Sequence, residues 1–497
     1  MRARSLAHEQ IVSPATKQQP IFRKANPLWL TAVEVVDESN QGIIKSHIPP
    51  VCDLRPGGCS QCHRAKLFCY GYLDPTQLLI HDETGSTQRK VLARQNSPHG
   101  LPPVLQLGWV VRARDTFFSL YVFGLSRSYH ALAPLYDQAT SSGHLSSCVD
   151  AVSLAFVSFQ CGSPAVLYMA RQKYVDGIRK VGQALQDPTT SLSDETLQSV
   201  LLLDLYEKMV NRNPHSLPSW TSHIRGAMSL VKARGARNFS SPIACQLSFR
   251  LSMTLPISYG LANLLMPKGS MGLMRELDPY ITGIKKDFTA LAADTFRLKC
   301  NIAHGRVSSS EAVQMARGIH SRLVALEAAF PPSWMPRSVI CADPRILGVR
   351  LDIYPDHFAA QLWNAVRFHR LATDDIIQTN SSGDSCVTKD AFQDIAVVVE
   401  QICAMVPQFI LPGLWPDNEM PFSPLQRLRC CTILAPLYIA GQLSNDLVIK
   451  NWAVQTLESI ADIGNLRIAR EVATLLASAR TDYWLVYAMS GSYAFAA

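Results

Sequence analysis

The sequence predicts an all-α protein, and two features of the chain support this. From about Leu105 onward, apolar residues recur at i, i+3 and i+4, the spacing that places them on one face of a helix. Alternating apolar and polar runs, which are typical of half-buried strands, are nearly missing. Hydrophobic residues make up 47% of the 497 residues and charged residues only 17%. The helices should therefore bury wide faces in a core, and the composition argues against global disorder.

Start and stop signals divide this region into separate helices. Ser193-Asp-Glu-Thr196 offers capping groups, and Asp187-Pro188 and Arg234-Gly235 are typical helix ends. A break is expected at Gly464-Asn465, and Thr379–Val387 is expected to be a loop. No fixed period of a repeat protein is present, so an irregular array of one or two lobes is predicted. The expected helices are Leu145–Phe159, Ala165–Leu185, Leu197–Tyr206, Ser219–Arg234, Ser308–Phe330, Pro355–Gln378, Lys389–Val406, Leu425–Gly441 and Asn445–Ala477.

Four parts are predicted along the chain: a disordered segment 1–51, a cysteine block 52–72, an extended linker 73–104 and a helical domain 105–497. The N-terminus lacks the apolar core of a signal peptide. The longest apolar candidate for a membrane span, Leu251–Met266, is interrupted by Pro256 and Gly260. We therefore expect a soluble intracellular protein with no membrane partner. The net charge of +8 is too small on this length to indicate a nucleic-acid binder throughout.

The cysteine block contains Cys52, Cys59, Cys62 and Cys69, separated by gaps of six, two and six residues. Such spacing lets four thiolates converge on one Zn²⁺ ion, which takes sulfur ligands at about 2.3 Å in a tetrahedron. Zinc is therefore the expected cofactor, and its binding would supply on the order of 10 kcal/mol to fold this short segment. The other nine cysteines are scattered, mostly in apolar contexts such as those of Cys161 and Cys403, and are expected to be buried free thiols.

The block resembles the C-terminal two-thirds of the binuclear zinc cluster (Zn₂Cys₆) of fungal transcription factors. That family has two Cys-x2-Cys-x6-Cys halves joined by a loop that contains proline. Cys52, Asp53 and Pro56 match the end of the first half and the loop, and the last three cysteines match the second half. The first two cysteines of the family pattern have no counterpart, since residues 1–51 contain no cysteine.

The helical region also resembles the fungal-specific transcription factor domain that follows such clusters. The resemblance implies a nuclear regulator of RNA polymerase II transcription, with DNA and the transcription machinery as partners. It also implies a helical region that regulates, forms a homodimer or senses a signal. The matching stretches are Ala151–Ala155, Ala170–Tyr174, Ala184–Pro188, Asp194–Leu197, Leu203–Glu207, Ser219–Ala227 through Gly235, Trp363–Arg367, Pro436–Gly441 and Trp452.

DNA contact in this family comes largely from basic residues in the half that is missing here. Arg64 and Lys66 remain as candidate DNA-binding residues, able to neutralise phosphates but carrying little sequence information; a solvated basic surface is the equally weighted alternative. Two interpretations follow. Either residues 1–51 come from a faulty gene model and the true protein carries the whole cluster, which the abrupt loss of pattern favours, or the chain is a truncated, DNA-independent interaction protein that modulates other regulators.

No catalytic spacing is found in the sequence, and an enzyme is not expected. His357 and His369 lie too far apart on one predicted helix to share a metal, so surface or satisfied histidines are expected. His223 is expected to have a packing or capping role. Trp363, Trp452 and Trp484 lie on apolar helical faces and are assigned to the core.

Overall fold

The computed structural model describes residues 60–64, 66, 108–140, 143–210, 217–267, 270–381, 385–478 and 482–490. The chain divides into two units, residues 1–106 and 107–497. In the first unit, the described helix is α1, Ser60–Arg64. The predicted disordered segment 1–51 and the predicted linker lie outside the described residues.

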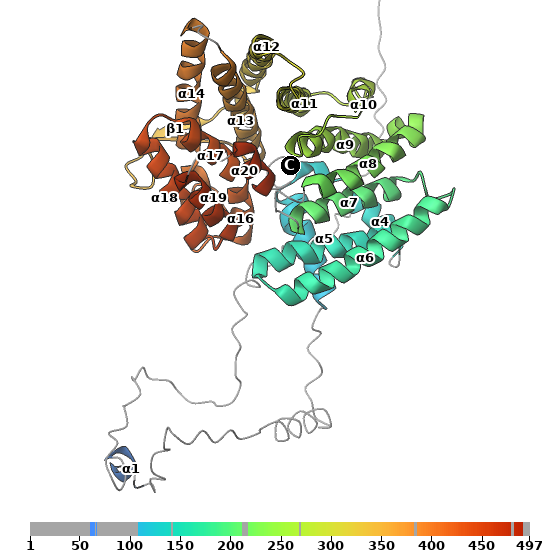
Figure 1. The fold of residues 1–497 in the computed structure, drawn as a ribbon. Coiled ribbons are helices and arrows are strands. Elements are labelled where there is room, and N and C mark those ends of the chain that lie inside the picture. Colours follow the sequence, from blue (N-terminus) through green and yellow to red (C-terminus); the bar gives the residue numbers. More distant parts are fainter. Residues whose placement is uncertain are drawn as a thin grey trace, which may run out of the picture. The chain divides into compact units, whose positions relative to one another are not determined.

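The second unit confirms the predicted all-α class (Figure 1). Its first half comprises α3 (Trp109–Thr116), the π-helical η2 (Phe117–Phe123), η3 (Arg127–Tyr129), α4 (Leu132–Gln138), α5 (His144–Cys161), α6 (Pro164–Gln186), α7 (Asp194–Val210), α8 (Leu217–Arg234), η5 (Gly235–Phe239), α9 (Pro242–Leu261) and α10 (Ser270–Glu276). The second half comprises α11 (Ile284–Ala303), α12 (Ser309–Ala328), η6 (Pro332–Trp334), β1 (Arg337–Ile340), β2 (Arg350–Ile353), α13 (His357–Asn380), α14 (Ser385–Met405), α15 (Pro407–Ile410), α16 (Pro424–Cys431), α17 (Leu434–Leu443), α18 (Leu447–Ile463), α19 (Arg467–Ala477) and α20 (Tyr483–Ser490).

Several helix starts follow directly from local chemistry. Ser163 and Ser241 cap α6 and α9, each accepting a hydrogen bond from a backbone amide three residues later, with a proline in the first turn. Ser308 and Glu311 form a reciprocal capping box at the start of α12. These groups satisfy amides that have no partner inside the helix, so the helices begin where the sequence places them.

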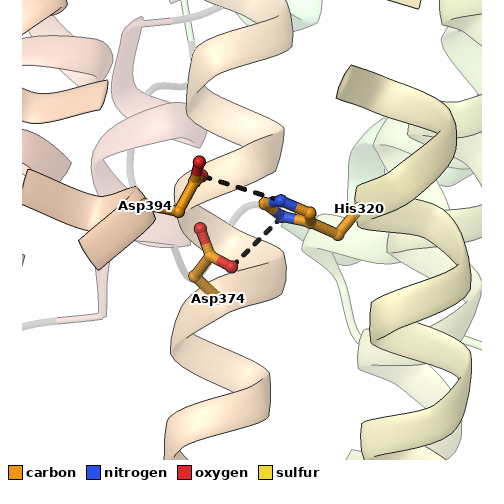
Figure 2. Close-up of side chains that lie close together, drawn as sticks. All are labelled: His320, Asp374 and Asp394. Atoms are coloured by element: carbon orange, nitrogen blue, oxygen red, sulfur yellow. Dashed lines mark ion pairs between the residues drawn. The ribbon is translucent and has the colours of Figure 1, made fainter. Parts of the chain in front are cut away.

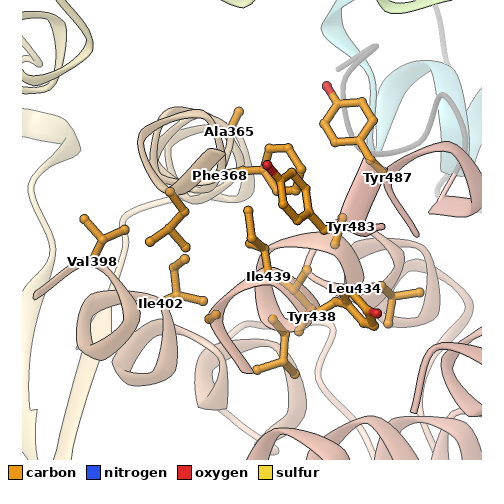
Figure 3. Packing of buried hydrophobic residues seen from close by; sticks show 14 of the residues in the cluster. Ala365, Phe368, Val398, Ile402, Leu434, Tyr438, Ile439, Tyr483 and Tyr487 are labelled. Atoms are coloured by element: carbon orange, nitrogen blue, oxygen red, sulfur yellow. The ribbon is translucent and has the colours of Figure 1, made fainter. Parts of the chain in front are cut away.

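Apolar side chains gather in two clusters. One is formed mainly by α3 to α10 and the other by α11 to α20. Figure 3 shows the second, where Phe368 of α13 lies beside Tyr483 of α20, their ring centroids 5.9 Å apart. Ile439 of α17 and Ile402 of α14 belong to the same cluster. The close packing of these helices fixes the positions of the polar groups between them.

The predicted helix boundaries hold for most elements, and the differences have local causes. The segment Leu425–Gly441 is two helices, α16 and α17, because the chain turns at Thr432 and Ile433. The predicted loop 379–387 is shorter, since α13 continues to Asn380 and α14 begins at Ser385. The antiparallel pair of β1 and β2, with Arg337 opposite Ile353, is too short to give a clear alternating pattern.

The apolar run Leu251–Met266, which was the longest sequence candidate for a membrane span, lies largely in α9, a helix that the sequence analysis did not predict. α9 runs through Pro256 and Gly260 to Leu261. A Cβ atom on Gly260 would lie 2.4 Å from a ring atom of Phe296, so this glycine permits the close approach of α9 and α11. The apolar composition of the segment is explained by burial within the protein.

One stretch, Cys386–Ile410, is long and apolar enough to cross a membrane by length and composition alone. Within its apolar window, 67% of the residues are buried inside the protein. A core helix passes the same test, and α14 and α15, which cover this stretch, contribute many residues to the second cluster, so burial accounts for the composition.

Candidate functional site

The predicted zinc and DNA-binding residues lie in the first unit. Cys62 lies in α1, and Cys52, Cys59 and Cys69 lie outside the described residues, so the zinc site stays a prediction. Arg64 and Lys66 are both exposed. The Arg64 Nε atom donates to the Ser60 carbonyl at 3.4 Å. Exposure is what a phosphate contact requires, and it is equally consistent with a solvated basic surface.

A polar cluster in the second unit joins three helices that the sequence gave no reason to connect. His320 and Glu327 are seven residues apart on α12, and Arg370 and Asp374 are four apart on α13. Each spacing puts its two side chains on one face of a helix. Asp394 of α14 completes the cluster.

Arg370 connects two of the carboxylates. Its Nη1 atom donates to Glu327 Oε2 at 2.6 Å, and its Nη2 atom donates to Asp394 Oδ1. The Arg370 side chain is only 8% exposed. Burial alone would lower the pKa of this guanidinium, but the charges of Glu327 and Asp394 outweigh burial and raise it. Arg370 therefore stays charged and ties α13 to both neighbouring helices.

His320 lies between two aspartates (Figure 2). Its Nδ1 atom is 3.1 Å from Asp374 Oδ1, and its Nε2 atom is 3.7 Å from Asp394 Oδ2. Asp374 is 1% exposed, and burial raises the pKa of its carboxyl group to about 6. The imidazole of His320 counters this rise, whereas the nearby charge of Asp394 adds to it.

The ligand atoms of His320, Asp374 and Asp394 lie within 4.8 Å of one another, a spacing that a metal site requires. Zinc binds one ring nitrogen of a histidine at about 2.0–2.1 Å. Here the two ring nitrogens of His320 face different carboxylates, and one of these, Asp394, is already paired with Arg370. The arrangement therefore fits an ion-pair network better than a metal centre.

A pocket lies elsewhere in this unit, among α9, α11, α13 and α20, with an empty volume of about 500 Å³ that includes open solvent. Its walls are mostly apolar and include Met253, Phe288 and Leu362. Lys285 of α11 is the cation among the described lining residues. Its Nζ atom donates to Ser128 Oγ at 2.7 Å. Burial and, to a smaller extent, the charge of Arg127 lower the pKa of this amine to about 7.

The three histidines noted in the sequence, His223, His357 and His369, pack against other side chains of the helical unit. The Nε2 atom of His223 lies 3.0 Å from the Tyr174 hydroxyl, and that hydroxyl donates to Glu207, which accords with the expected packing role. The expectation for His357 and His369 was wrong, because both are buried and none of their ring nitrogens has a hydrogen-bond partner among the described residues. Aromatic rings surround them, and burial lowers the pKa of each to about 3.

Of the other sequence-based assignments, some are confirmed by the structure and one is wrong. Trp363, Trp452 and Trp484 are buried, as predicted. Cys403 is buried, but Cys161 is exposed because it lies in the last turn of α5, beyond the covered part of the helix. The polar cluster and the pocket were both missed. The sequence offered one signal for the polar cluster: titratable residues spaced by i+7 on α12 and by i+4 on α13, which places each pair on one helix face. This spacing does not show which helices meet.

Comparison with known proteins identifies the class of the first part of the helical unit. Residues 114–330 match the family model described as the fungal specific transcription factor domain. The predicted resemblance to this domain is thereby confirmed over those residues. The stretches around Trp363, Pro436 and Trp452, like the cysteine block, lie outside the matched residues.

An uncharacterized protein of Emericella nidulans is 33% identical over 105 residues, which cover 20% of this chain and 21% of that protein. The chain therefore matches about a fifth of the length of this curated relative. No solved structure matches the chain.

Proposed function

We propose that the protein is a fungal transcription regulator that acts in the nucleus on RNA polymerase II transcription. The observation that carries the proposal is the match of residues 114–330 to the fungal specific transcription factor domain. The all-α unit built on two apolar clusters is consistent with a regulatory domain that binds partners, including a second copy of the chain and the transcription machinery. No enzymatic activity is assigned, because the clustered titratable groups form an ion-pair network between packed helices.

In the finer form of the proposal, the cysteine block holds zinc and contacts DNA. Cys52, Cys59, Cys62 and Cys69 supply four thiolates, the ligand set of a structural zinc site. Arg64 follows Cys62 by two residues and is exposed, as is Lys66, so both can neutralise phosphates. Sequence-specific binding further requires that the cluster is completed by the two upstream cysteines of the family pattern.

The test is binding of the full chain to duplex DNA at several salt concentrations, with zinc and with a chelator. The double variant Arg64→Ala/Lys66→Ala should reduce the slope of log K against log salt by about 0.9 for each lost phosphate contact. Arg225→Ala/Lys232→Ala removes the same charge from exposed positions on α8 and should leave the slope unchanged. An unchanged slope in the first variant, or binding that survives zinc removal, would refute the DNA-reading role of this block.

A second function is favoured by one observation: the matched residues 114–330 lie wholly in the helical unit and do not include the cysteine block. The chain would then be a DNA-independent helical interaction protein that modulates other regulators. Sequencing the 5′ end of the native transcript separates the two forms. An upstream exon that supplies Cys-x2-Cys-x6 joined to Cys52 supports the DNA reader, and a transcript that encodes residues 1–51 as written supports the interaction protein.

A further inference from the structure

We propose that the outward face of α6 binds an amphipathic helix of another protein, one that carries acidic residues beside its own apolar stripe. Such a surface goes beyond the transcriptional function proposed above. It lies within the helical unit, and its binding does not depend on DNA contact by the cysteine block.

A mostly apolar stripe runs along the outward face of α6. Two sets of positions, each spaced by seven residues and offset from the other by three, make up this stripe: Tyr168, Val175 and Gly182, and Arg171, Ile178 and Leu185. We call these six residues the α6 seam. Positions that repeat every 3.5 residues on average lie along one side of a helix, and two helices pack against each other through such positions. At 1.5 Å per residue, the seam is about 26 Å long.

The seam is exposed although its side chains are large and apolar. Tyr168 and Val175 are 62% and 65% exposed, and Ile178 and Leu185 are 42% and 43% exposed. α6 packs on α5 and α7 with another face (Figure 1). The residues that α6 buries there are smaller: Val166, Ala170, Gly177, Val181 and Ala184. A surface helix normally buries its large apolar residues, and a contiguous exposed apolar stripe indicates an interaction site.

Gly182 leaves a gap in the seam between Ile178 and Leu185. A Cβ atom on Gly182 would have no other atom within 4 Å, whereas a Cβ atom on Gly177 would lie 3.1 Å from the Cys148 Sγ atom of α5. Gly177 therefore permits the packing of α6 on α5. Gly182 has no such contact within the chain, although glycine destabilises a helix interior, and it lets the backbone of a partner helix approach closely.

The charges at the seam are basic. Arg171 is exposed within the seam and forms no ion pair among the residues that the structure describes. Arg179 follows Ile178, and its side chain is 65% exposed. The carboxylates close to the seam are already engaged, since Asp176 accepts a hydrogen bond from Arg179 at 2.6 Å and Glu207 of α7 accepts one from Tyr174. The free charge at the seam therefore complements acidic side chains on a partner.

Other occupants fit the seam less well. A second copy of α6 would bring Arg171 and Arg179 of both chains together, and like charges at an interface oppose binding. An amphipathic helix on a membrane buries a whole apolar face among lipids, whereas the apolar part of the exposed face is a narrow stripe bordered by Gln172 and Gln183. An acidic amphipathic helix matches both the spacing and the charge of the seam.

The test is fluorescence anisotropy of a labelled three-heptad peptide titrated with the full chain. The peptide has leucine at positions a and d and glutamate at positions e and g, and its like charges oppose pairing with itself. It should bind saturably and at least about tenfold more tightly than the same peptide with lysine at e and g, with a smaller difference at high salt. Absence of saturable binding, or equal binding of the two peptides, overturns the proposal.

Two double variants locate the site. Val175→Glu/Ile178→Glu places two carboxylates in the seam and should weaken binding of the acidic peptide about tenfold or more. The matched control is Leu447→Glu/Val448→Glu at the start of α18, where the two side chains are 72% and 65% exposed, and it should leave binding unchanged. All four positions are exposed, so both variants should keep the fold. Equal weakening by the two variants overturns the proposal.

The basic residues are tested separately. Arg171→Gln/Arg179→Gln keeps the apolar side chains of the seam and should remove the preference for the glutamate peptide over the lysine peptide. A preference that persists in this variant overturns the proposal.

Two further measurements identify the other occupants. Analytical ultracentrifugation and cosedimentation with phosphatidylserine vesicles should give the same result for the wild type and for Val175→Glu/Ile178→Glu. A dimer that this variant dissociates would assign the seam to a second copy, and vesicle binding that it abolishes would assign the seam to a membrane. Either result overturns the proposal.

Discussion

Replacing Arg370 by methionine tests whether the polar cluster holds α12, α13 and α14 together. The substitution keeps most of the apolar volume but removes the charge that Glu327 and Asp394 share. The side chains of these three residues are 8%, 11% and 23% exposed, so water can only partly solvate the carboxylates left behind. Removing one partner of a buried ion pair typically costs about 3–5 kcal/mol. We expect the free energy of unfolding to fall by about that amount at pH 7.

Denaturant unfolding measured by circular dichroism provides the assay. The matched control is Arg322→Met on α12, whose guanidinium is 59% exposed and lies 2.9 Å from Asp294. Its loss should cost about 0–1 kcal/mol, because exposed pairs are weak. Adding Glu327→Gln and Asp394→Asn to Arg370→Met should recover much of the stability by removing the unpaired charges. A loss in Arg370→Met as small as in the control would refute a stabilising role of the network.

Three further predictions concern single side chains. The Asp374 carboxyl has a folded-state pKa of about 6 against an ordinary value of 3.8, so its contribution to stability is present below pH 3.8 and is lost as pH rises to about 6. Asp374→Asn should therefore flatten the dependence of the free energy of unfolding on pH in this range, measured by unfolding at several pH values. The His369 imidazole has a pKa lowered to about 3, so its contribution to stability is present above pH 6.5 and is lost as pH falls toward 3. The variant His369→Phe should therefore gain stability relative to the wild type at pH 5 more than at pH 8. An equal effect at both pH values would contradict this. Cys161 should react with a maleimide in the native protein, whereas Cys403, which is buried with a pKa raised to about 12, should react only after unfolding. Mass spectrometry of the labelled peptides measures this, and labelling of Cys403 in the native protein would contradict the prediction.

Local signals predicted most of the helices correctly. Ser308 and Glu311 are three residues apart, and Ser163 accepts from the backbone amide three residues later at the start of α6, so these capping hydrogen bonds depend on the local sequence alone. Local signals did not predict α9, which runs through Pro256 and Gly260 and in which Gly260 allows close packing against Phe296. They also failed for Cys161, which lies in the last turn of α5, beyond the buried part of that helix.

The sequence by itself determined the all-α class, the helical periodicity, the resemblance to the fungal-specific transcription factor domain and the candidate residues for zinc and DNA, because these depend on residue type and spacing along the chain. Only the tertiary structure decided which polar residues meet. His320, Asp374 and Asp394 come from three helices, and Lys285 meets Ser128 across 157 positions of sequence. Such encounters depend on which helix faces bury against each other, and the apolar pattern of one helix says that a face is buried without naming its partner.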